Sequence, residues 1–150
     1  MPSGTKRGMA IGIGIDLLNL SKVKRLFHGH KKQAFQNLFT PSEQKILSQR
    51  PSSQPSSRGR RGNKFSPLPQ GEGQGEGRMI LRAARLLAAK EAFFKASSLT
   101  WMGPDGFKDI EVKCFPGSRF QVQSLIAPVS GKGCFFEREQ LVGAQVIVWR

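Results

Sequence analysis

The chain has 150 residues, of which 38% are hydrophobic, and it carries a formal net charge of +14. This length predicts about one domain with a substantial hydrophobic core. No apolar run approaches the roughly 20 residues of a membrane-spanning helix, and the N-terminus lacks the apolar segment and cleavage site of a signal peptide. We expect one domain over residues 1–150, cytoplasmic and without a membrane partner. The positive charge predicts an anionic partner: a phosphorylated small molecule, a nucleic acid or an acidic protein.

Residues 9–18, MAIGIGIDLL, alternate between two kinds of side chain. One face would hold Ile11, Ile13, Ile15 and Leu17, and the other Ala10, Gly12, Gly14 and Asp16. Such alternation predicts a β-strand. Its glycines leave one face nearly bare, which allows a ligand or another backbone to approach closely. Asp16 would stand at the end of this open face.

The next two segments predict helices. Ser21 is a plausible N-cap for residues 22–39, although Gly29 could interrupt that helix. Residues 40–43, TPSE, combine Thr40 as N-cap, Pro41 in the first turn and Glu43 three residues after the cap. This is the pattern of a capping box, so we expect a second helix to begin there.

Residues 51–77 are rich in Pro, Ser, Gly and Gln and hold only two large apolar side chains. We interpret them as a disordered insertion, because they cannot bury enough apolar surface to fix a conformation. Beyond them, residues 109–115, 119–126 and 143–149 alternate like strands, with turns at residues 116–117 and 131–133. The order of elements predicts an α+β fold with a mainly antiparallel sheet packed against helices.

Residues 81–96, LRAARLLAAKEAFFKA, predict a helix with a charge in its apolar stripe. With about 100° per residue, Glu91 falls within about 40° of Ile80, between Leu87 and Phe94. Lys95 lies one turn later, but such a pair stabilises a helix by only about 0.3–0.5 kcal/mol, whereas burying a carboxylate without adequate partners costs several. Either Glu91 forms an exposed pair with Lys95 at the rim, or the stripe faces a polar cleft.

Asp16 and Glu91 together suggest a metal site. Two carboxylates suit Mg²⁺, which keeps several waters and takes further ligands from substrate phosphates. The two cysteines and two histidines lack the spacing of a zinc site. Lys95 would face the same phosphates, an arrangement suited to phosphate-group transfer.

Three segments carry a family resemblance: GIGIDL at residues 12–17, FTPSE at 39–43 and AAKEAFFKA at 88–96. They resemble the signature segments of holo-[acyl-carrier-protein] synthases, the short bacterial type of 4′-phosphopantetheinyl transferase. The resemblance implies the fold of that superfamily and transfer of the 4′-phosphopantetheine arm of coenzyme A to a serine of an acyl carrier protein. It also implies a homotrimer with active sites between subunits.

By the same resemblance, Asp16 and Glu91 would be the Mg²⁺ ligands, and Lys95 would bind the coenzyme A phosphates and assist catalysis. We also expect Lys90 to bind coenzyme A. The serine proton would pass either to Glu91 or to a metal-bound water.

Acyl carrier proteins are acidic. The basic segment that holds Lys22, Lys24 and Arg25 is therefore the docking surface we expect for the carrier protein.

The sequence departs from the family pattern at three places. Leu86 stands where the family usually has an Arg, Asn19 stands where an acidic residue often follows the metal Asp, and no His occurs after His30. A catalytically impaired homologue is thus one alternative. A basic nucleic-acid-binding module is the other, supported by the charge and by SSRGRRGNK at residues 56–64. We favour the enzyme, because no recognised nucleic-acid-binding motif occurs.

Overall fold

The computed structural model describes residues 9–49, 74–99 and 104–150. In chain order its elements are β1 (Ala10–Asn19), α1 (Leu20–Leu38), α2 (Pro41–Ser48), α3 (Gln74–Ser97), the 3₁₀ helix η1 (Pro104–Asp109), β2 (Ile110–Phe115), β3 (Arg119–Ser124), β4 (Ser130–Arg138) and β5 (Leu141–Trp149). The strands form one sheet in the order β1-β5-β4-β3-β2, with antiparallel neighbours throughout. The predicted α+β fold with an antiparallel sheet is confirmed.

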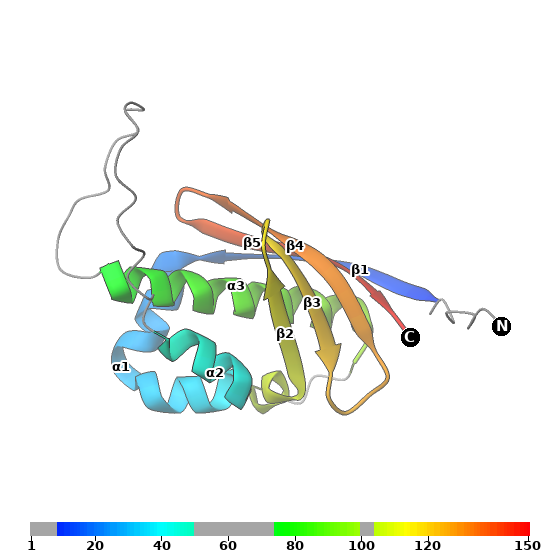
Figure 1. The fold of residues 1–150 in the computed structure, drawn as a ribbon, viewed down its shortest axis with the longest axis horizontal. Helices are drawn as coiled ribbons and strands as arrows, with labels where there is room; N and C mark the ends of the chain where they lie inside the picture. The colour runs from blue at the N-terminus through cyan, green and yellow to red at the C-terminus, as the bar shows by residue number, and fades with distance from the viewer. Residues whose placement is uncertain (1–8, 50–73, 100–103) are drawn as a thin grey trace.

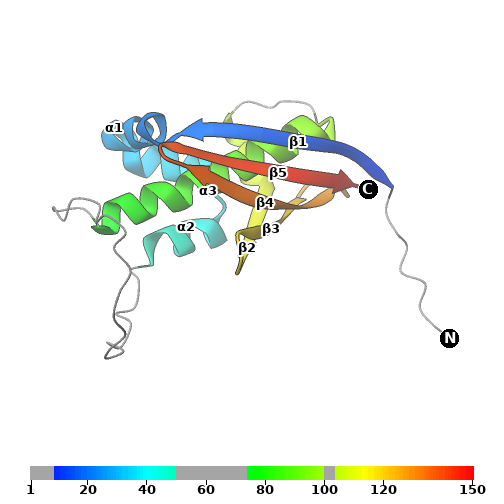
Figure 2. The same ribbon diagram turned by 90° about the horizontal axis from the view of Figure 1, so that it is seen from above.

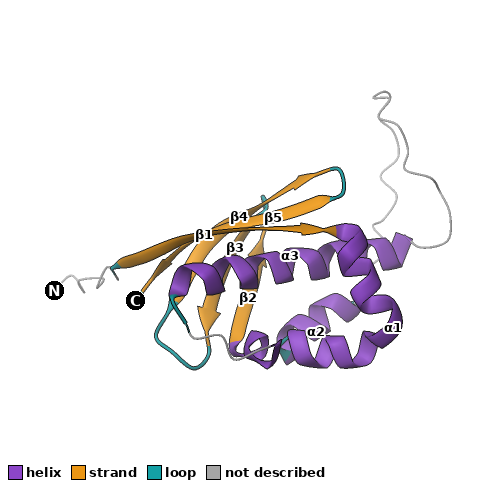
Figure 3. Ribbon diagram, turned by 180° about the vertical axis from the view of Figure 1, so that it is seen from behind, coloured by secondary structure: helices purple, strands orange, loops and turns teal. Residues whose placement is uncertain are grey.

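The domain has three layers. Helix α3 runs along one face of the sheet, and α1 and α2 lie on the far side of α3 (Figures 1 and 3). The hydrophobic core lies on both sides of α3 and includes Phe27, Phe39, Phe93, Phe120 and Val146, all almost fully buried. Helix α3 is therefore the central element, and its side chains face the sheet, the other helices or the solvent.

Small residues let α3 lie very close to β1. A Cβ atom at Gly12 would collide with the carbonyl oxygen of Ala96, and one at Gly14 with that of Ala92. Both alanines are buried on α3. The glycine face of β1 is thus filled by a helix backbone, which is one of the two partners that the sequence left open.

Two helix starts differ from the sequence-based expectations. Helix α1 begins at Leu20, and Asn19 rather than Ser21 caps it, because the Ser21 amide donates to the Asn19 side chain (2.9 Å). The helix also continues through Gly29. Helix α3 begins at Gln74, so residues 74–77 of the predicted insertion are helical, and the rest of that segment, residues 51–73, lies outside the described residues. The capping box of α2 is confirmed by reciprocal bonds between Thr40 and Glu43.

Strand β4 is not among the strands that the sequence predicts. Its first part, with Gly131 and Gly133, was assigned to a turn, yet both glycines pair in the sheet. The ring of Phe120, the cross-strand partner of Gly133, covers the space where a Cβ atom of that glycine would stand. The glycines therefore make room for a core side chain instead of reversing the chain.

The outer face of the sheet exposes a group of apolar side chains. Ile13 is 74% exposed, Ile15 and Leu17 are each 56% exposed, and Ile147, which pairs with Ile13, is 51% exposed. Figure 2 views this side, where β1, β5 and β4 lie in front of α3. Large exposed apolar patches of this kind mark interaction surfaces. We call Ile13, Ile15, Leu17 and Ile147 the outer apolar patch.

In the part of the chain that the structure describes, none of the helices has both the length and the apolar character needed to cross a membrane.

Candidate active site

Asp16 lies on the face of β1 that α3 covers. It follows Gly12 and Gly14 on alternate positions of the strand, and only 7% of its surface is exposed. The close approach of α3 at the two glycines brings the helix within reach of this carboxylate. Gly12 and Gly14 therefore set the distance between helix and strand, and Asp16 contacts the side chains of the helix.

Lys95 of α3 forms an ion pair and hydrogen bond with Oδ1 of Asp16. The lysine side chain is 56% exposed, whereas the aspartate side chain is only 6% exposed. The Asp16 carboxylate raises the pKa of Lys95 above its usual value, chiefly through this hydrogen bond. Lys95 thus stays charged at neutral pH and presents a cation at the edge of the site.

Glu91 is partly buried one helical turn before Lys95. Burial raises the pKa of Glu91, the nearby charge of Asp16 raises it further, and Lys95 partly offsets both effects. Asp16, Glu91 and Lys95 therefore form one electrostatic cluster, as the sequence predicted. Within the described residues, however, the ion pair of Lys95 is with Asp16, so Lys95 offsets the burial of Glu91 only in part and without a direct ion pair.

The cluster suits a divalent cation. Oδ2 of Asp16 is buried and has no hydrogen-bond partner among the described residues, although buried polar atoms are normally paired. Two neighbouring carboxylates, one with an unused oxygen and one with a raised pKa, share the single positive charge of Lys95. Among residues 9–49, 74–99 and 104–150, no group of three or more His, Cys, Asp or Glu side chains could hold a metal. A cation here would complete its shell with water and phosphate oxygens, as Mg²⁺ commonly does.

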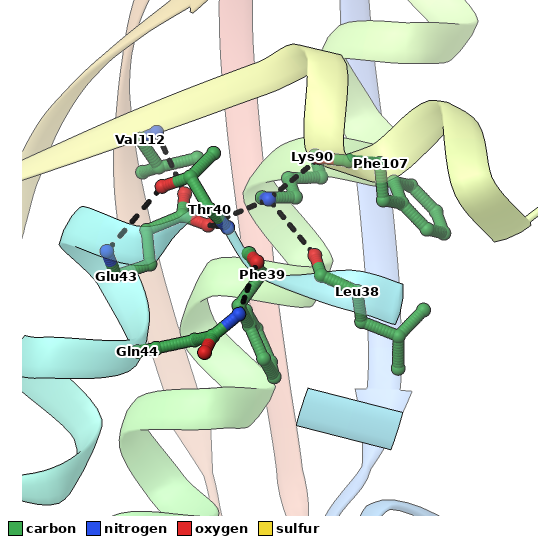
Figure 4. Close-up of polar contacts among 8 residues, drawn as sticks. All are labelled: Leu38, Phe39, Thr40, Glu43, Gln44, Lys90, Phe107 and Val112. Carbon is green, nitrogen blue, oxygen red and sulfur yellow. Dashed lines mark hydrogen bonds and ion pairs between the residues drawn. The ribbon is translucent and has the colours of Figure 1, made fainter. Parts of the chain in front are cut away.

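Lys90, which was also predicted to bind coenzyme A, lies outside the cluster of Asp16, Glu91 and Lys95. Its side chain has no exposed surface, and its Nζ is 2.6 Å from Oε2 of Glu43. The same Nζ donates to the carbonyl oxygens of Leu38 (2.9 Å) and Phe107 (2.7 Å), as Figure 4 shows. All three ammonium protons are therefore used inside the domain. In this conformation Lys90 offers no donor to coenzyme A, which corrects the expected direct role.

Glu43 was not recognised as a partner of Lys90 from the sequence. Its place in the capping box already explained its presence, and the two residues are far apart in the chain. Its Oε2 accepts from the Thr40 amide and its Oε1 from the Val112 amide, each at 2.9 Å. Apart from Glu91, no Asp or Glu lies within one helical turn of Lys90. This was the only sign in the sequence that its partner comes from another element.

Two of the three departures from the family pattern, Leu86 and Asn19, have defined places in the structure. Leu86 is buried in the core, and Arg85 pairs with Glu137 of β4 and lies over the Phe135 ring. Asn19 caps α1. The side chain of Arg85 therefore points to the sheet, and no arginine takes the position of Leu86.

Lys22, Lys24 and Arg25 are exposed on the first two turns of α1. Because α1 begins directly after β1, these turns follow Asp16 closely in the chain. The predicted basic surface is therefore present at the start of α1.

Comparisons with known proteins agree with this fold. A model of the 4′-phosphopantetheinyl transferase superfamily matches residues 12–146. No curated protein sequence gave a match. Among solved structures, a holo-(acyl-carrier-protein) synthase from Bacillus anthracis, in complex with CoA (3′,5′-ADP), has a TM-score of 0.61 at 22% identity and covers 94% of this chain and 97% of its own.

Two further synthase structures share the fold. The holo-ACP-synthase from Plasmodium yoelii has a TM-score of 0.63 at 16% identity, with 97% of this chain and 99% of that chain covered. The holo-[acyl-carrier-protein] synthase from Helicobacter pylori, in complex with coenzyme A, has a TM-score of 0.58 at 17% identity, with 91% and 98% covered.

The chain belongs to the 4′-phosphopantetheinyl transferase superfamily, because the family model spans almost its whole length. This confirms the resemblance seen in the sequence. The protein is accordingly an enzyme of the phosphopantetheinyl transferase class.

Proposed function

We propose that the protein transfers the 4′-phosphopantetheine group from coenzyme A to a serine of an acyl carrier protein, with Mg²⁺ held by Asp16 and Glu91. The observation that carries the proposal is the cluster of two buried or partly buried carboxylates and one lysine beside the glycine face of β1. Membership of the superfamily supports the transfer, and coenzyme A is the compound bound in the synthase structures from Bacillus anthracis and Helicobacter pylori.

Each residue of the cluster has a role that its environment supports. Asp16 offers its unused Oδ2, and Glu91 offers a carboxylate whose negative charge lacks a full counter-charge. When bound, Mg²⁺ supplies positive charge that stabilises the phosphate oxygens as the bond to the leaving group breaks. Lys95, partly exposed at the edge, binds the coenzyme A phosphates and adds a second positive charge.

The carrier serine attacks the β-phosphorus of coenzyme A, and the bond from this phosphorus to the bridging oxygen breaks. The products are the serine phosphodiester and 3′,5′-adenosine bisphosphate. The serine proton needs an acceptor, and the carboxylate of Glu91, which lies beside Asp16 and Lys95, is one group that can take it. A water beside Glu91 is the other acceptor that the arrangement allows.

The carrier protein docks on the first turns of α1 in this proposal. Lys22, Lys24 and Arg25 supply positive charge to an acidic partner, and rim charges of this kind chiefly raise the encounter rate. Their nearness to Asp16 in the chain supports a carrier bound close to the reacting groups.

The outer apolar patch is the surface we propose for a homotrimer. Its four aliphatic side chains lie on two adjacent strands, and β1 is an edge strand with one free side. A second copy would bury apolar surface that otherwise meets water. A three-fold arrangement uses two different surfaces of each copy, so the patch supplies one side of the contact.

Transfer is tested by incubating the protein with coenzyme A, Mg²⁺ and an apo acyl carrier protein. Mass spectrometry of the carrier should show the gain of one 4′-phosphopantetheine group. No gain with the carrier proteins of several bacteria, at stoichiometric enzyme, would favour an impaired homologue. Salt-sensitive binding to arbitrary DNA or RNA in place of coenzyme A binding would favour the nucleic-acid-binding alternative.

A further inference from the structure

The ion pair of Glu43 and Lys90 is completely buried, and the proposed mechanism does not use it. Neither side chain has any exposed surface, and the Nζ–Oε2 distance is 2.6 Å. Burial lowers the pKa of Lys90 and raises that of Glu43, and the mutual attraction of the two charges opposes both shifts. A buried pair often contributes no more stability than well-packed apolar side chains of similar volume. The attraction between the two charges alone therefore gives no reason for an ion pair at these two positions.

The pair connects five elements through directional bonds. Glu43 of α2 accepts the backbone amides of Thr40 and, on β2, Val112. Lys90 of α3 donates to the carbonyl of Leu38 at the end of α1 and to that of Phe107 in η1. Figure 4 shows these bonds meeting at the carboxylate of Glu43 and the ammonium group of Lys90. Since each bond depends on direction as well as distance, Lys90 has a single position in which all three of its protons are used.

The position of Lys90 determines where the next residue points. With about 100° per residue and Lys90 at zero, Glu91 and Lys95 lie at roughly 100° and 140° around α3. Ala92 and Ala96, which contact the β1 glycines, lie at roughly 200° and 240°. The two functional side chains thus lie between one face fixed by the ion pair and another fixed by the strand.

These two contacts fix different properties of the helix. The glycine contact sets the distance of α3 from β1, and buried apolar side chains such as Leu86 and Phe93 pack α3 against its neighbours. These contacts oppose rotation or sliding of the helix less strictly than directional hydrogen bonds do. The bonds of Lys90 oppose both movements. Apolar side chains in place of the pair would fill the same volume without fixing one direction.

We propose that the Glu43–Lys90 pair is a positioning device that sets the rotation of α3 so that Glu91 faces Asp16. The inference rests on the proposed role of Asp16 and Glu91 as ligands of a divalent cation. Glu43 and Lys90 are positioning residues, because they act only through Glu91 and do not touch the cation or the substrates.

The test replaces both charges at once, with the double variant Glu43→Leu and Lys90→Met. Removing both partners leaves no unpaired buried charge, but four backbone groups lose a hydrogen-bond partner. We therefore expect the protein to fold with a lowered melting temperature, and binding is measured well below it. Binding of Mn²⁺ alone is measured by the loss of the free-ion paramagnetic resonance signal. We expect the affinity of the double variant to fall about 10-fold or more, as happens when groups that orient metal ligands are removed.

The matched control is Arg82→Met. The Arg82 side chain also joins α3 to α2, by hydrogen bonds to the carbonyl oxygens of Ile46 and Gln49 at the C-terminal end of α2. It lies more than two turns from Glu91, so Mn²⁺ affinity should stay within two-fold of the parent value. In transfer assays the double variant should lose kcat while the KM for the carrier protein is unchanged.

Three results distinguish the explanations. A double variant that binds Mn²⁺ as the parent does would overturn the positioning role and leave the proposed metal site intact. If the parent does not bind Mn²⁺, the metal site is overturned and this inference with it. The same conclusion follows if the Asp16→Ala variant binds Mn²⁺ as tightly as the parent does. If the double variant does not fold, the same thresholds apply to Glu43→Asp, which keeps the charge but withdraws it by one methylene group.

Discussion

Lys95 of α3 and Asp16 of β1 form an ion pair across 79 positions of the chain. It joins the two elements that the resemblance to phosphopantetheinyl transferases placed in one site. It also leaves Glu91 without a direct positive partner in the described part of the chain, although Glu91 and Lys95 have the spacing of a helical ion pair. This arrangement supports the proposal of a further cation at the site.

Removing either carboxylate should stop transfer while the fold stays intact. Asp16→Ala and Glu91→Gln should each lower kcat/KM by about 100-fold or more, because each removes charge stabilisation that exists only with the cation in place. Initial rates measured by mass spectrometry check this, with circular dichroism as evidence of folding. Glu139→Gln, an exposed change in the β4–β5 turn, is the control and should behave as the parent. Normal Mg²⁺-dependent activity in either site variant would refute the assignment.

Glu91→Gln should also stabilise the metal-free protein at neutral pH. The folded-state pKa of Glu91 is raised above the usual 4.5, so the ionised side chain is less favourable in the folded protein than in the unfolded chain. This cost is complete above the raised pKa, and it disappears as the pH falls to 4.5 and below, where Glu91 is protonated in both states. The melting temperature of Glu91→Gln should therefore exceed that of the parent at pH 7 and equal it near pH 4. A lower melting temperature at pH 7 would mean that Glu91 is already well paired.

Reversing the charge of the α1 surface should weaken binding of the carrier protein to the enzyme and leave binding of coenzyme A nearly unchanged. With Lys22, Lys24 and Arg25 all changed to Glu, we expect the KM for carrier protein to rise about 10-fold at low salt, because steering of an acidic partner is lost. The KM for coenzyme A should change by less than two-fold. Steady-state kinetics at two salt concentrations measure both values.

A charge-matched control separates local docking from the loss of net positive charge. The same reversal at Lys45, Arg78 and Arg119, which are exposed on α2, α3 and β3, should leave the KM for carrier protein near the parent value. Equal effects of the two triple variants would exclude α1 as the specific docking surface.

Charges placed in the outer apolar patch should dissociate the proposed trimer. Ile13→Lys with Ile147→Lys puts two like charges on neighbouring positions of β1 and β5, where a second copy would have to bury them. Light scattering after gel filtration should give the mass of a monomer for this variant and of a trimer for the parent. Leu125→Lys, an equally exposed apolar residue after β3, should remain trimeric. A monomeric parent that is fully active would show that the patch serves another purpose.

The proposed insertion should be dispensable. Residues 51–73 connect the α2 and α3 regions and have a composition that cannot form a core, and lengthening a loop costs only about 0.6 kcal/mol per doubling. Replacing them with a short Gly/Ser linker should leave transfer activity within two-fold of the parent. Trypsin should cut the parent first at Arg58, Arg60, Arg61 or Lys64. Resistance of this segment to trypsin, or loss of activity in a folded deletion variant, would indicate that its arginines bind a partner.

The fold was largely predictable from local patterns, and the exceptions have a common cause. Alternation gave β1 and its two faces, and residue types gave the capping box of α2. Glycine misled the assignment of β4, because the space beside Gly131 and Gly133 is taken by atoms of the neighbouring strands. These are the backbone oxygens of Ile147 and Gln145 on β5 and the ring of Phe120 on β3. A pattern along one strand contains no information about such a cross-strand neighbour. For the same reason the alternation of β1 could not show which of its faces meets the helix.

The candidate site residues that the sequence could indicate are charged side chains at positions where an apolar or small residue is expected. Asp16 and Glu91 stand out because a carboxylate interrupts an apolar or bare face. Lys90 did not reveal its role, since its partner Glu43 belongs to another helix and already had a function as a capping residue. Long-range pairing of two charges leaves no periodic signal, so only the structure could reassign Lys90 from substrate binding to the interior.

The rate of transfer as a function of Mg²⁺ concentration, in the parent and in Glu91→Gln, tests the proposed site most directly. The parent should show a saturable increase with Mg²⁺ and lose its activity when the metal is removed with EDTA. Glu91→Gln should need far more Mg²⁺ and reach a much lower maximum. Transfer by the parent that continues at full rate in EDTA would contradict the proposal that Asp16 and Glu91 act by holding a divalent cation.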